Sequence, residues 1–290
     1  MQFLFKVFTL FAVLIFHAKC DKLENTTITV ATLIGRPYTM FTSVREGEIL
    51  TGNARFEGYI IDLLDLLAKN LGFSYDIHII EDHRYGSKHS GEWDGLIGEV
   101  RSGRATIGAA DITITREREE AVDFTVPFIS LGISILYKRS SDGKALPFTN
   151  VEELAASAET IKVGCVRGGS TCQFFKNSDN PIYKRIYERM ATADPPTFTD
   201  TNAEGIERVQ SGEFAFFMES TTIDYVVQHH CGLQQVGGLL DSKGYGLAVQ
   251  EGSPLREQLS LAILSLQESG DLVKLHDKWW KNKNGEKCDP

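Results

Sequence analysis

Segments typical of β-strands alternate with segments typical of α-helices along most of the chain. Residues 28–34 are rich in β-branched side chains, and apolar residues then recur between Ile60 and Leu71 at the spacing of one helix face. We expect strands at 28–34, 75–80, 105–114, 132–138, 161–166, 214–218 and 245–250, and helices at 60–71, 93–100, 203–210, 221–228, 254–268 and 271–280. This alternation predicts an α/β fold with mostly parallel sheets.

The first twenty residues differ in composition from the rest of the chain. Residues 1–18 are nearly all apolar, and two lysines are the only charged residues before position 21. An apolar run of this length at the N-terminus is typical of a secretory signal peptide, and the small residues Ala18 and Cys20 favour cleavage after Cys20. The alternative is an uncleaved membrane anchor. We expect a signal peptide over residues 1–20 and a secreted, extracellular protein.

The remaining sequence limits the partners that the protein can bind. No other stretch approaches the roughly 18 apolar residues that a membrane helix needs, so we expect no membrane span. Removal of residues 1–20 takes away two lysines and no acidic side chain, which changes the formal net charge from −9 to −11. A protein this acidic is a poor general partner for nucleic acids and anionic membranes. An anionic ligand therefore needs a local positive site.

Four cysteines follow the expected cleavage point, and an even number in an exported protein is typical of disulfides. They are Cys165, Cys172, Cys231 and Cys288, and their spacing alone leaves three pairings open. The single N-glycosylation sequon of the sequence begins at Asn25. These residues predict a disulfide-bonded glycoprotein.

A glycine-rich segment, Gly168-Gly169-Ser170-Thr171, follows the predicted strand at 161–166. Glycines let the backbone turn with its amides exposed, and a serine or threonine then caps the next helix. The positive end of a helix suits a carboxylate or a phosphate. The segment therefore fits either an anion site or a plain helix cap. It is not a phosphate-binding P-loop, because no Gly-Lys-Ser/Thr follows.

A charged turn follows the predicted strand at 105–114. It runs from Asp111 through Thr113 to Arg118. The planar guanidinium of Arg118 has the geometry to clamp a carboxylate with two parallel hydrogen bonds. The competing interpretation is a solvated turn at the surface.

Glu219 ends the apolar predicted strand at 214–218 and precedes a predicted helix. Ligands of α/β folds bind at the carboxyl edge of the parallel strands. A carboxylate at this place can hold an ammonium group, or it can cap the helix that follows.

Catalytic and metal-binding patterns are weak. His229, His230 and Cys231 are adjacent rather than spaced along one helix face, which does not favour a metal site. There is no nucleophile elbow. We therefore expect a binding protein rather than an enzyme, with no metal, no cofactor and no catalytic residue.

Taken together, these segments resemble the ligand-binding core of ionotropic glutamate receptors, and the kainate type most closely. The resemblance covers roughly residues 28–288, and its strings lie in the family's order. They are Phe56-Glu57-Gly58-Tyr59, Tyr85-Gly86, Arg118-Glu119 through Val122-Asp123-Phe124, Leu131 through Tyr137, Met218 through Ile223, Asp241 through Gly246, and Lys278-Trp279-Trp280. The resemblance implies a bilobed, type-II periplasmic-binding-protein-like clamshell, with lobe 1 at residues 26–131 and 245–290 and lobe 2 at 132–244.

In the receptors of this family, membrane segments and a pore interrupt the chain after the match at Ile135 to Tyr137, and a further membrane segment follows the Trp-Trp pair. Here a short polar stretch at 140–147 stands at the first place. The resemblance therefore implies a soluble, secreted form of the core, without the pore or the large N-terminal domain.

The resemblance gives ligand-binding roles to Tyr85, Asp111, Thr113, Arg118, Ser170, Thr171 and Glu219. Arg118 would clamp the ligand α-carboxylate, helped by the backbone N–H of Thr113. Glu219 and the Thr113 hydroxyl would hold the α-ammonium group. Ser170 and Thr171 would bind a distal carboxylate at the helix start. These complementary charges imply reversible binding of L-glutamate in a cleft that closes on it.

Two positions depart from the family pattern, and both bear on the affinity for the ligand and on closure of the cleft more than on the class of ligand. Asp111 stands where these receptors usually have a proline whose carbonyl takes the ammonium, so its carboxylate either contacts the ammonium or turns away. Gly35 stands where AMPA-type receptors have a glutamate that bonds across the closed cleft. Tyr85 would cover the ligand as in the family.

Two other functions fit the same resemblance. One is an enzyme on this fold, such as a dehydratase of cyclic acids. Against this function, the sequence has no candidate acid–base pair beyond the residues that ligand binding already needs. The other is a pore-less receptor subunit that acts with membrane partners. A homodimer is compatible with either binding function.

The family also pairs cysteines at the places of Cys231 and Cys288, which implies a disulfide between them here. Such a bond would stabilise the fold by roughly 4 kcal/mol in the chain-entropy model. Cys165 and Cys172 have no matching counterpart, and whether they form a second, local bridge is left open.

Overall fold

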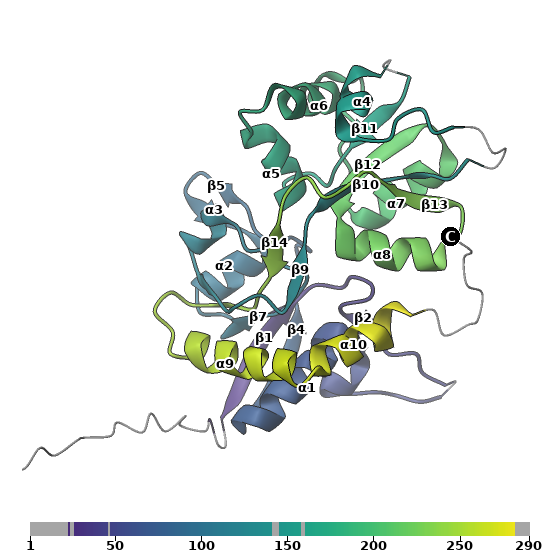
Figure 1. Cartoon of the computed structure of the whole chain (residues 1–290). Coiled ribbons are helices and arrows are strands. Elements are labelled where there is room, and N and C mark those ends of the chain that lie inside the picture. Colours follow the sequence, from purple (N-terminus) through teal and green to yellow (C-terminus); the bar gives the residue numbers. More distant parts are fainter. Residues whose placement is uncertain (1–22, 24–25, 46, 141–144, 158–159, 282–290) are drawn as a thin grey trace, which may run out of the picture.

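The computed structural model describes residues 23, 26–45, 47–140, 145–157 and 160–281 (Figure 1). The expected signal peptide, the sequon residue Asn25 and Cys288 lie outside these residues. The described chain forms two lobes, each built on its own β-sheet with helices packed around it.

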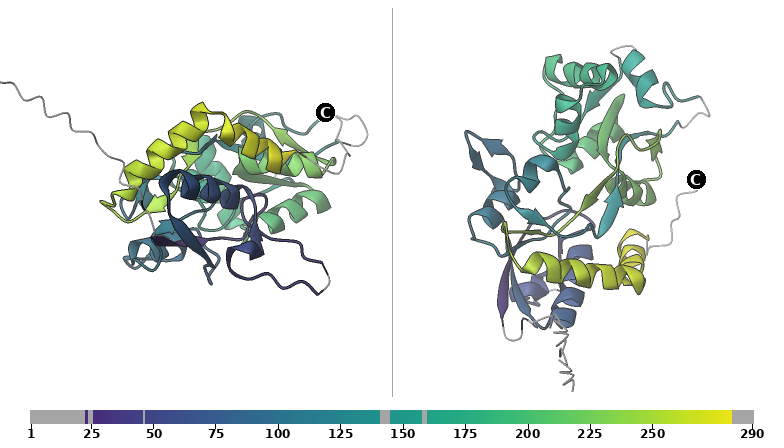
Figure 2. Two further views of the ribbon diagram at one scale, coloured as in Figure 1. Left: turned by 90° about the horizontal axis from the view of Figure 1, so that it is seen from below. Right: turned by 60° about the vertical axis from the view of Figure 1, so that its left-hand side comes forward.

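Lobe 1 contains a five-stranded sheet in the order β4-β1-β7-β15-β8. Its strands are β1 (Thr27–Thr32), β4 (Ser74–Ile79), β7 (Ile107–Gly108), β8 (Asp123–Phe124) and β15 (Ala248–Val249). Its helices are α1 (Tyr59–Leu71), α2 (Gly95–Arg101), α3 (Arg116–Glu119), α9 (Leu255–Glu268) and α10 (Asp271–Trp280). Short elements complete it: β2 (Met40–Phe41), η1 (Gly52–Arg55), β3 (Phe56–Glu57), β5 (Lys88–His89) and β6 (Glu92–Trp93). Helices α9 and α10 run across this lobe against α1 (Figure 2).

Lobe 2 contains a four-stranded sheet in the order β11-β12-β10-β13. Its strands are β10 (Ile133–Lys138), β11 (Lys162–Gly164), β12 (Phe214–Glu219) and β13 (Leu233–Val236). Its helices are α4 (Val151–Ala156), α5 (Ser170–Asn177), α6 (Pro181–Thr192), α7 (Asn202–Ser211) and α8 (Ser220–His229). Each lobe has separate hydrophobic clusters on the two faces of its sheet.

Helix α1 shows how a local pattern produces the core of lobe 1. Its residues Leu63, Leu64 and Leu67 are fully buried, because apolar side chains three and four positions apart share one helix face. The helix begins after Gly58, where a Cβ atom would collide with the Tyr38 carbonyl. It ends at Gly72, which has the left-handed conformation (φ 79°) that closes many helices.

A two-stranded antiparallel ribbon joins the lobes. Strand β9 (Ile129–Leu131) enters lobe 2 and pairs with β14 (Lys243–Tyr245), which returns to lobe 1. The expected lobe boundaries at 131/132 and 244/245 fall at the two strands of this ribbon, and they stay a prediction.

The sheets are mixed, so the prediction of mostly parallel sheets is wrong. Strand β1 is parallel to β4 and β7, and β11 is parallel to β12. Strand β15 is antiparallel to both of its neighbours, and so is β10. The reason is topological: β10 and β15 follow the ribbon, so each enters its sheet from the interlobe side rather than through a helical crossover.

Several predicted elements differ from the structure. The expected strand at 105–114 is reduced to Ile107–Gly108, because the chain leaves the sheet there and Thr113 bridges to Tyr245 instead. The expected strand at 245–250 is divided between β14 and β15, and Trp93 lies in β6 rather than in a helix. Helices α4 and α6 were not predicted.

Over the described residues, no helix is both long enough and apolar enough to cross a membrane.

Candidate functional site

A cavity lies between the lobes, at the ends of β12 and α5. Its lobe 1 wall is formed by Tyr85, Asp111 and Arg118. Its lobe 2 wall is formed by Val166, Gly169, Ser170, Thr171, Asn202, Phe217, Met218 and Glu219. Arg118 and Ser170 also line a second, larger hollow between the lobes. Six of the seven predicted ligand-binding residues therefore line one cavity, and Thr113 is hydrogen-bonded to two of them.

Backbone contacts hold the lobe 1 wall in place. Thr113 forms a bridge with Tyr245, and the next residue, Ile114, donates its N–H to the Gly244 carbonyl (2.9 Å). Thr115 caps α3 by accepting the N–H of Arg118 at 3.3 Å. The Arg118 side chain turns back and donates from Nη1 to the Thr113 carbonyl (2.8 Å). The guanidinium is thus fixed by the same turn that carries it.

Arg118 is the buried cation of the site, with a residue exposure of 5%. Burial lowers the pKa of its guanidinium, while the Glu219 carboxylate raises it. An arginine side chain keeps its charge in proteins, because its ordinary pKa lies far above neutrality. A buried, charged arginine needs anionic partners, which makes the cavity suited to a carboxylate.

The start of α5 forms part of the lobe 2 wall. Gly169 is its N-cap, and Ser170 and Thr171 are its first two residues. Thr171 is buried. The N–H groups in the first turn of a helix have no partner within the helix, and the helix dipole is positive there. This end of the cavity therefore presents donors and partial positive charge.

Glu219 connects the two walls. It ends β12 and is the N-cap of α8, and its Oε1 accepts hydrogen bonds from the hydroxyls of Ser170 (2.7 Å) and Thr113 (2.8 Å). The two hydroxyl oxygens lie 3.1 Å apart. Because each hydroxyl has one proton and donates it to Glu219, these oxygens are neighbours rather than partners. The carboxylate is therefore oriented by one hydroxyl from each lobe.

Asp111 and Tyr85 form a second polar pair in the lobe 1 wall. The Tyr85 hydroxyl donates to Asp111 Oδ2 at 2.8 Å. Burial raises the pKa of the Asp111 carboxyl to about 6, although the Tyr85 hydrogen bond opposes the shift. Asp111 thus lines the cavity while being hydrogen-bonded to Tyr85, and its contact with a ligand stays a prediction.

Further hydrogen bonds join the lobes around the cavity. The Tyr38 hydroxyl of lobe 1 donates to Thr221 Oγ1 at the start of α8 (3.0 Å), and the Trp280 indole donates to the Thr221 carbonyl (2.7 Å). On another side, Ser87 Oγ donates to the Gly168 carbonyl (3.1 Å). The lobes are in direct contact, as expected of a closed clamshell.

Five further residues line the cavity without a predicted ligand-binding role: Val166, Gly169, Asn202, Phe217 and Met218. Gly169 lies in the glycine-rich segment that the sequence marks as a candidate anion site. Asn202 had a detectable signal, since it follows the N-cap Thr201 and precedes Glu204, the spacing of a capping box. Phe217 and Met218 lie on a strand that was predicted, but the pattern does not show which of its residues reach the ligand side.

The structure pairs two cysteines whose pairing the sequence left open. Cys165 and Cys172 form a disulfide with a Cα–Cα distance of 5.6 Å. Cys231 is disulfide-bonded, but Cys288 lies outside the described residues, so the pairing of these two stays a prediction. In the described part of the chain, no group of three or more His, Cys, Asp or Glu side chains is arranged to hold a metal ion.

Comparison with known proteins assigns the chain to a family. The family described as the ligated ion channel L-glutamate- and glycine-binding site matches residues 26–141. Glutamate receptor ionotropic, kainate 1, from Homo sapiens is 30% identical over 377 aligned positions, which cover 90% of this chain and 41% of the receptor. The same receptor from Rattus norvegicus is also 30% identical, with 39% of its length covered. The chain thus spans about two fifths of the curated relatives that it matches.

The aligned region is longer than the 290 residues of this chain, so the receptors have residues within the matched region that have no counterpart here. A solved structure described as Drosophila muscle GluRIIB complex with glutamate superimposes with a TM-score of 0.82 and 38% identity. It covers 88% of this chain and 99% of that one. This likeness confirms the predicted bilobed clamshell. By sequence and by structure, the chain belongs to the family of ionotropic glutamate receptor ligand-binding cores.

Proposed function

We propose that this protein binds L-glutamate reversibly in the cavity between its lobes. The observation that carries the proposal is the placement of Arg118 and Glu219, which face one cavity from opposite lobes. Each is a charged group in a largely buried position. An α-amino acid has the complementary pair of charges within one small molecule, so it can neutralise both at once.

The charges also define where each end of the ligand lies. The α-carboxylate pairs with Arg118, whose fork geometry matches a carboxylate. The α-ammonium pairs with Glu219, which the hydroxyls of Thr113 and Ser170 already orient. The side-chain carboxylate lies at the start of α5, beside Ser170 and Thr171, where helix N–H groups favour an anion.

This arrangement selects for a second carboxylate in the ligand. Glutamine presents a neutral amide to a helix N-terminus, which stabilises an anion more than an amide. Glycine has no group to reach Ser170 and Thr171, so their donors lose that partner. The protein should therefore prefer glutamate to glutamine and prefer it strongly to glycine.

Asp111 supports a competing specificity. Its carboxylate is the second acidic group of the cavity, together with Glu219, and two like charges repel an acidic ligand. If Asp111 dominates, the site prefers a neutral or basic amino acid. The Tyr85 hydroxyl donates to Asp111 Oδ2, so this carboxylate already has a hydrogen-bond partner in its own lobe, which favours glutamate.

Competition binding on one purified sample tests the proposal. Calorimetry with L-glutamate gives the reference affinity, and glutamine, glycine, alanine and arginine then compete for the site. The expected order has glutamate first. Tighter binding of glycine or arginine would show that the start of α5 is not a carboxylate site. Absence of binding by all five amino acids would contradict the proposed function itself.

We also propose that the protein acts outside the cytosol, as the extracellular parts of its receptor relatives do. The Cys165–Cys172 disulfide supports this location, since disulfides persist in oxidising compartments. Expression of the whole chain in secretory cells tests it. The protein should accumulate in the medium with a glycan at Asn25, and retention in the membrane fraction would contradict secretion.

A further inference from the structure

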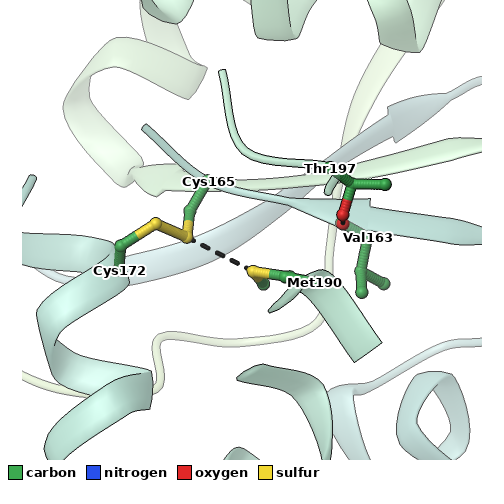
Figure 3. Close-up of a disulfide and its surroundings, with 5 residues drawn as sticks. All are labelled: Val163, Cys165, Cys172, Met190 and Thr197. Carbon is green, nitrogen blue, oxygen red and sulfur yellow. Dashed lines mark hydrogen bonds between the residues drawn. A yellow bond between two sulfur atoms is a disulfide. The ribbon is translucent and has the colours of Figure 1, made fainter. Parts of the chain in front are cut away.

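The Cys165–Cys172 disulfide spans the segment that leads into the proposed anion site. Cys165 directly follows β11, and Cys172 is the third residue of α5 (Figure 3). The six residues between them include the N-cap Gly169 and both proposed ligand residues of the helix start. The bond therefore ties the end of a strand to the first turn of a helix, across the loop that lines the cavity.

The strand end is firmly anchored in lobe 2. Cys165 is fully buried, and its carbonyl accepts the N–H of Thr199 at 3.1 Å. Its sulfur lies 3.3 Å from the sulfur of Met190 on α6 (Figure 3). This is a packing contact, because the Cys165 sulfur is bonded to Cys172 and has no proton to donate. Cys165 thus provides a fixed point from which the helix start can be held.

The loop itself has weaker means of holding its shape. Arg167 donates its N–H to the Thr199 carbonyl (2.8 Å) and Gly169 donates its N–H to the Val166 carbonyl (3.1 Å), but the segment between these bonds and the helix consists of Gly168 and Gly169. Gly168 has a φ of 71°, a conformation that glycine adopts freely and leaves as freely. The backbone that carries Ser170 is therefore joined to the anchored strand through the two most permissive residues of the segment.

The body of α5 is fixed at a different place. Phe175 is fully buried, and its ring centroid lies 4.5 Å from that of Phe217 on β12. This contact lies one turn further along the helix than Thr171. The first turn lacks the intrahelical bonds that hold later turns, so it depends on what precedes it. The disulfide is the covalent link at that turn.

We propose that the Cys165–Cys172 disulfide positions the first turn of α5 and so sets the affinity of the site for the distal carboxylate of its ligand. Cys165 and Cys172 are positioning residues, and they act through Ser170, Thr171 and the N–H groups around them. The effect on affinity rests on the proposed glutamate binding, whereas the effect on the helix start does not.

Removal of the bond tests the proposal by calorimetry. The double variant Cys165→Ala/Cys172→Ala should bind L-glutamate about tenfold more weakly, a change of about 1.4 kcal/mol. The matched control is Val209→Ala, which truncates a fully buried side chain elsewhere in lobe 2 and leaves the disulfide intact. It should lower the Tm but keep the affinity within about twofold. Wild-type affinity in the double variant, or an equal loss in the control, would overturn the proposal.

A second arm separates positioning from general stability. Thr171→Val is made both in the wild-type protein and in the disulfide-free background. If the bond acts through the helix start, Thr171→Val weakens glutamate binding by a smaller factor when the bond is already absent, because coupled sites are not additive. Factors that simply multiply would contradict the proposal.

A third arm needs no ligand. Amide hydrogen exchange in the ligand-free protein should become faster over residues 166–172 in the double variant, with β12 unchanged. Unchanged exchange over 166–172 would overturn the positioning role even if glutamate binds. If wild-type protein does not bind glutamate, the proposed function fails and this arm still decides the role of the bond. Should the alanine pair fail to fold, Cys165→Val/Cys172→Ala fills more of the lost volume and takes its place.

Discussion

The two walls of the cavity hold their functional groups by different means. In lobe 1, Thr113 and Arg118 are fixed by backbone pairing with β14 and by a hydrogen bond between the two residues themselves. In lobe 2, the start of α5 follows two glycines and is tied back by a disulfide. A turn that is paired with a neighbouring strand needs no covalent link, whereas a helix end that follows a permissive loop gains its position from one.

The walls also differ in the kind of charge that they present. Lobe 1 contributes a full positive charge on Arg118, whereas lobe 2 contributes the negative charge of Glu219 together with the partial charges and hydroxyl groups at the start of α5. Full charges in buried positions interact more strongly than dipoles. We therefore expect substitution of Arg118 to have a larger effect than substitutions at the start of α5.

The largest effect is expected for Arg118→Ala. The ligand α-carboxylate loses a charge-assisted pair, and truncation of such a buried partner costs about 2–5 kcal/mol of binding free energy. Arg118→Lys should also bind poorly, since a point charge cannot fork. Calorimetry with glutamate measures both. The control is Arg116→Ala on the same short helix, where the side chain is 95% exposed and the affinity should stay within about twofold. Wild-type affinity in Arg118→Ala would show that Arg118 of the lobe 1 wall does not bind the ligand α-carboxylate.

Asp111→Asn tests the second charge of the lobe 1 wall through the pH dependence of stability. The pKa of Asp111 is raised from its ordinary value of 3.8 to about 6, so between these values the folded protein holds a proton that the unfolded chain releases. Its contribution to stability is therefore full below pH 3.8 and is lost as the pH rises through 6.

In thermal unfolding, wild-type protein should lose up to about 3 kcal/mol relative to Asp111→Asn between pH 3.5 and pH 7. Parallel Tm profiles of the two proteins across this range would show that Asp111 titrates normally and that its wall is more polar than its burial suggests.

Thr171→Val tests the lobe 2 wall. Loss of a hydroxyl that bonds a charged group should weaken glutamate binding by about 1.5 kcal/mol. Glycine has no distal carboxylate, so its affinity should change much less. Thr171→Ser keeps the hydroxyl and serves as the control. Equal losses for glutamate and glycine would mean that the residue supports the fold of the lobe and not the ligand.

The smallest effect is expected for Ser87→Ala, which removes a contact between the walls. The Ser87 hydroxyl reaches the Gly168 carbonyl at an exposed edge of the cleft, where a hydrogen bond contributes little. Glutamate affinity should fall by about twofold at most. A loss larger than that of Thr171→Val would show that contact between the lobes outweighs the groups inside the cavity.

The sequence predicts well the elements whose burial is periodic, and α1 is the clearest of them. Helix α6 was missed although Asn180 caps it, Pro181 begins it, and Ile186 and Met190 share its buried face. Strand direction could not be predicted, because the partners of β10 and β15 are chosen by the interlobe ribbon rather than by local pattern.

The site was predicted by resemblance rather than by periodicity. Arg118 and Glu219 are 101 positions apart, and nothing local to either indicates that they share a cavity. The partner of Asp111 also depends on distant sequence, since the Tyr85 hydroxyl reaches it from 26 positions away. The helix that begins at Asn202 was predicted, but the sequence does not show that its first residue faces the cavity, so Asn202 was missed.

The ribbon of β9 and β14 has a consequence for the order in which the chain is made. All four strands of the β11-β12-β10-β13 sheet lie between its two strands in sequence, together with both cysteines of the local disulfide. The other sheet lacks β15, and α1 lacks α9 and α10, until the last part of the chain appears. Since domains generally fold as units during synthesis, the second lobe can fold and form its bond on the ribosome while the first still awaits its closing helices. Protease protection of nascent chains stalled at a length that places β14 outside the ribosome while α9 and α10 are still inside it would report this order.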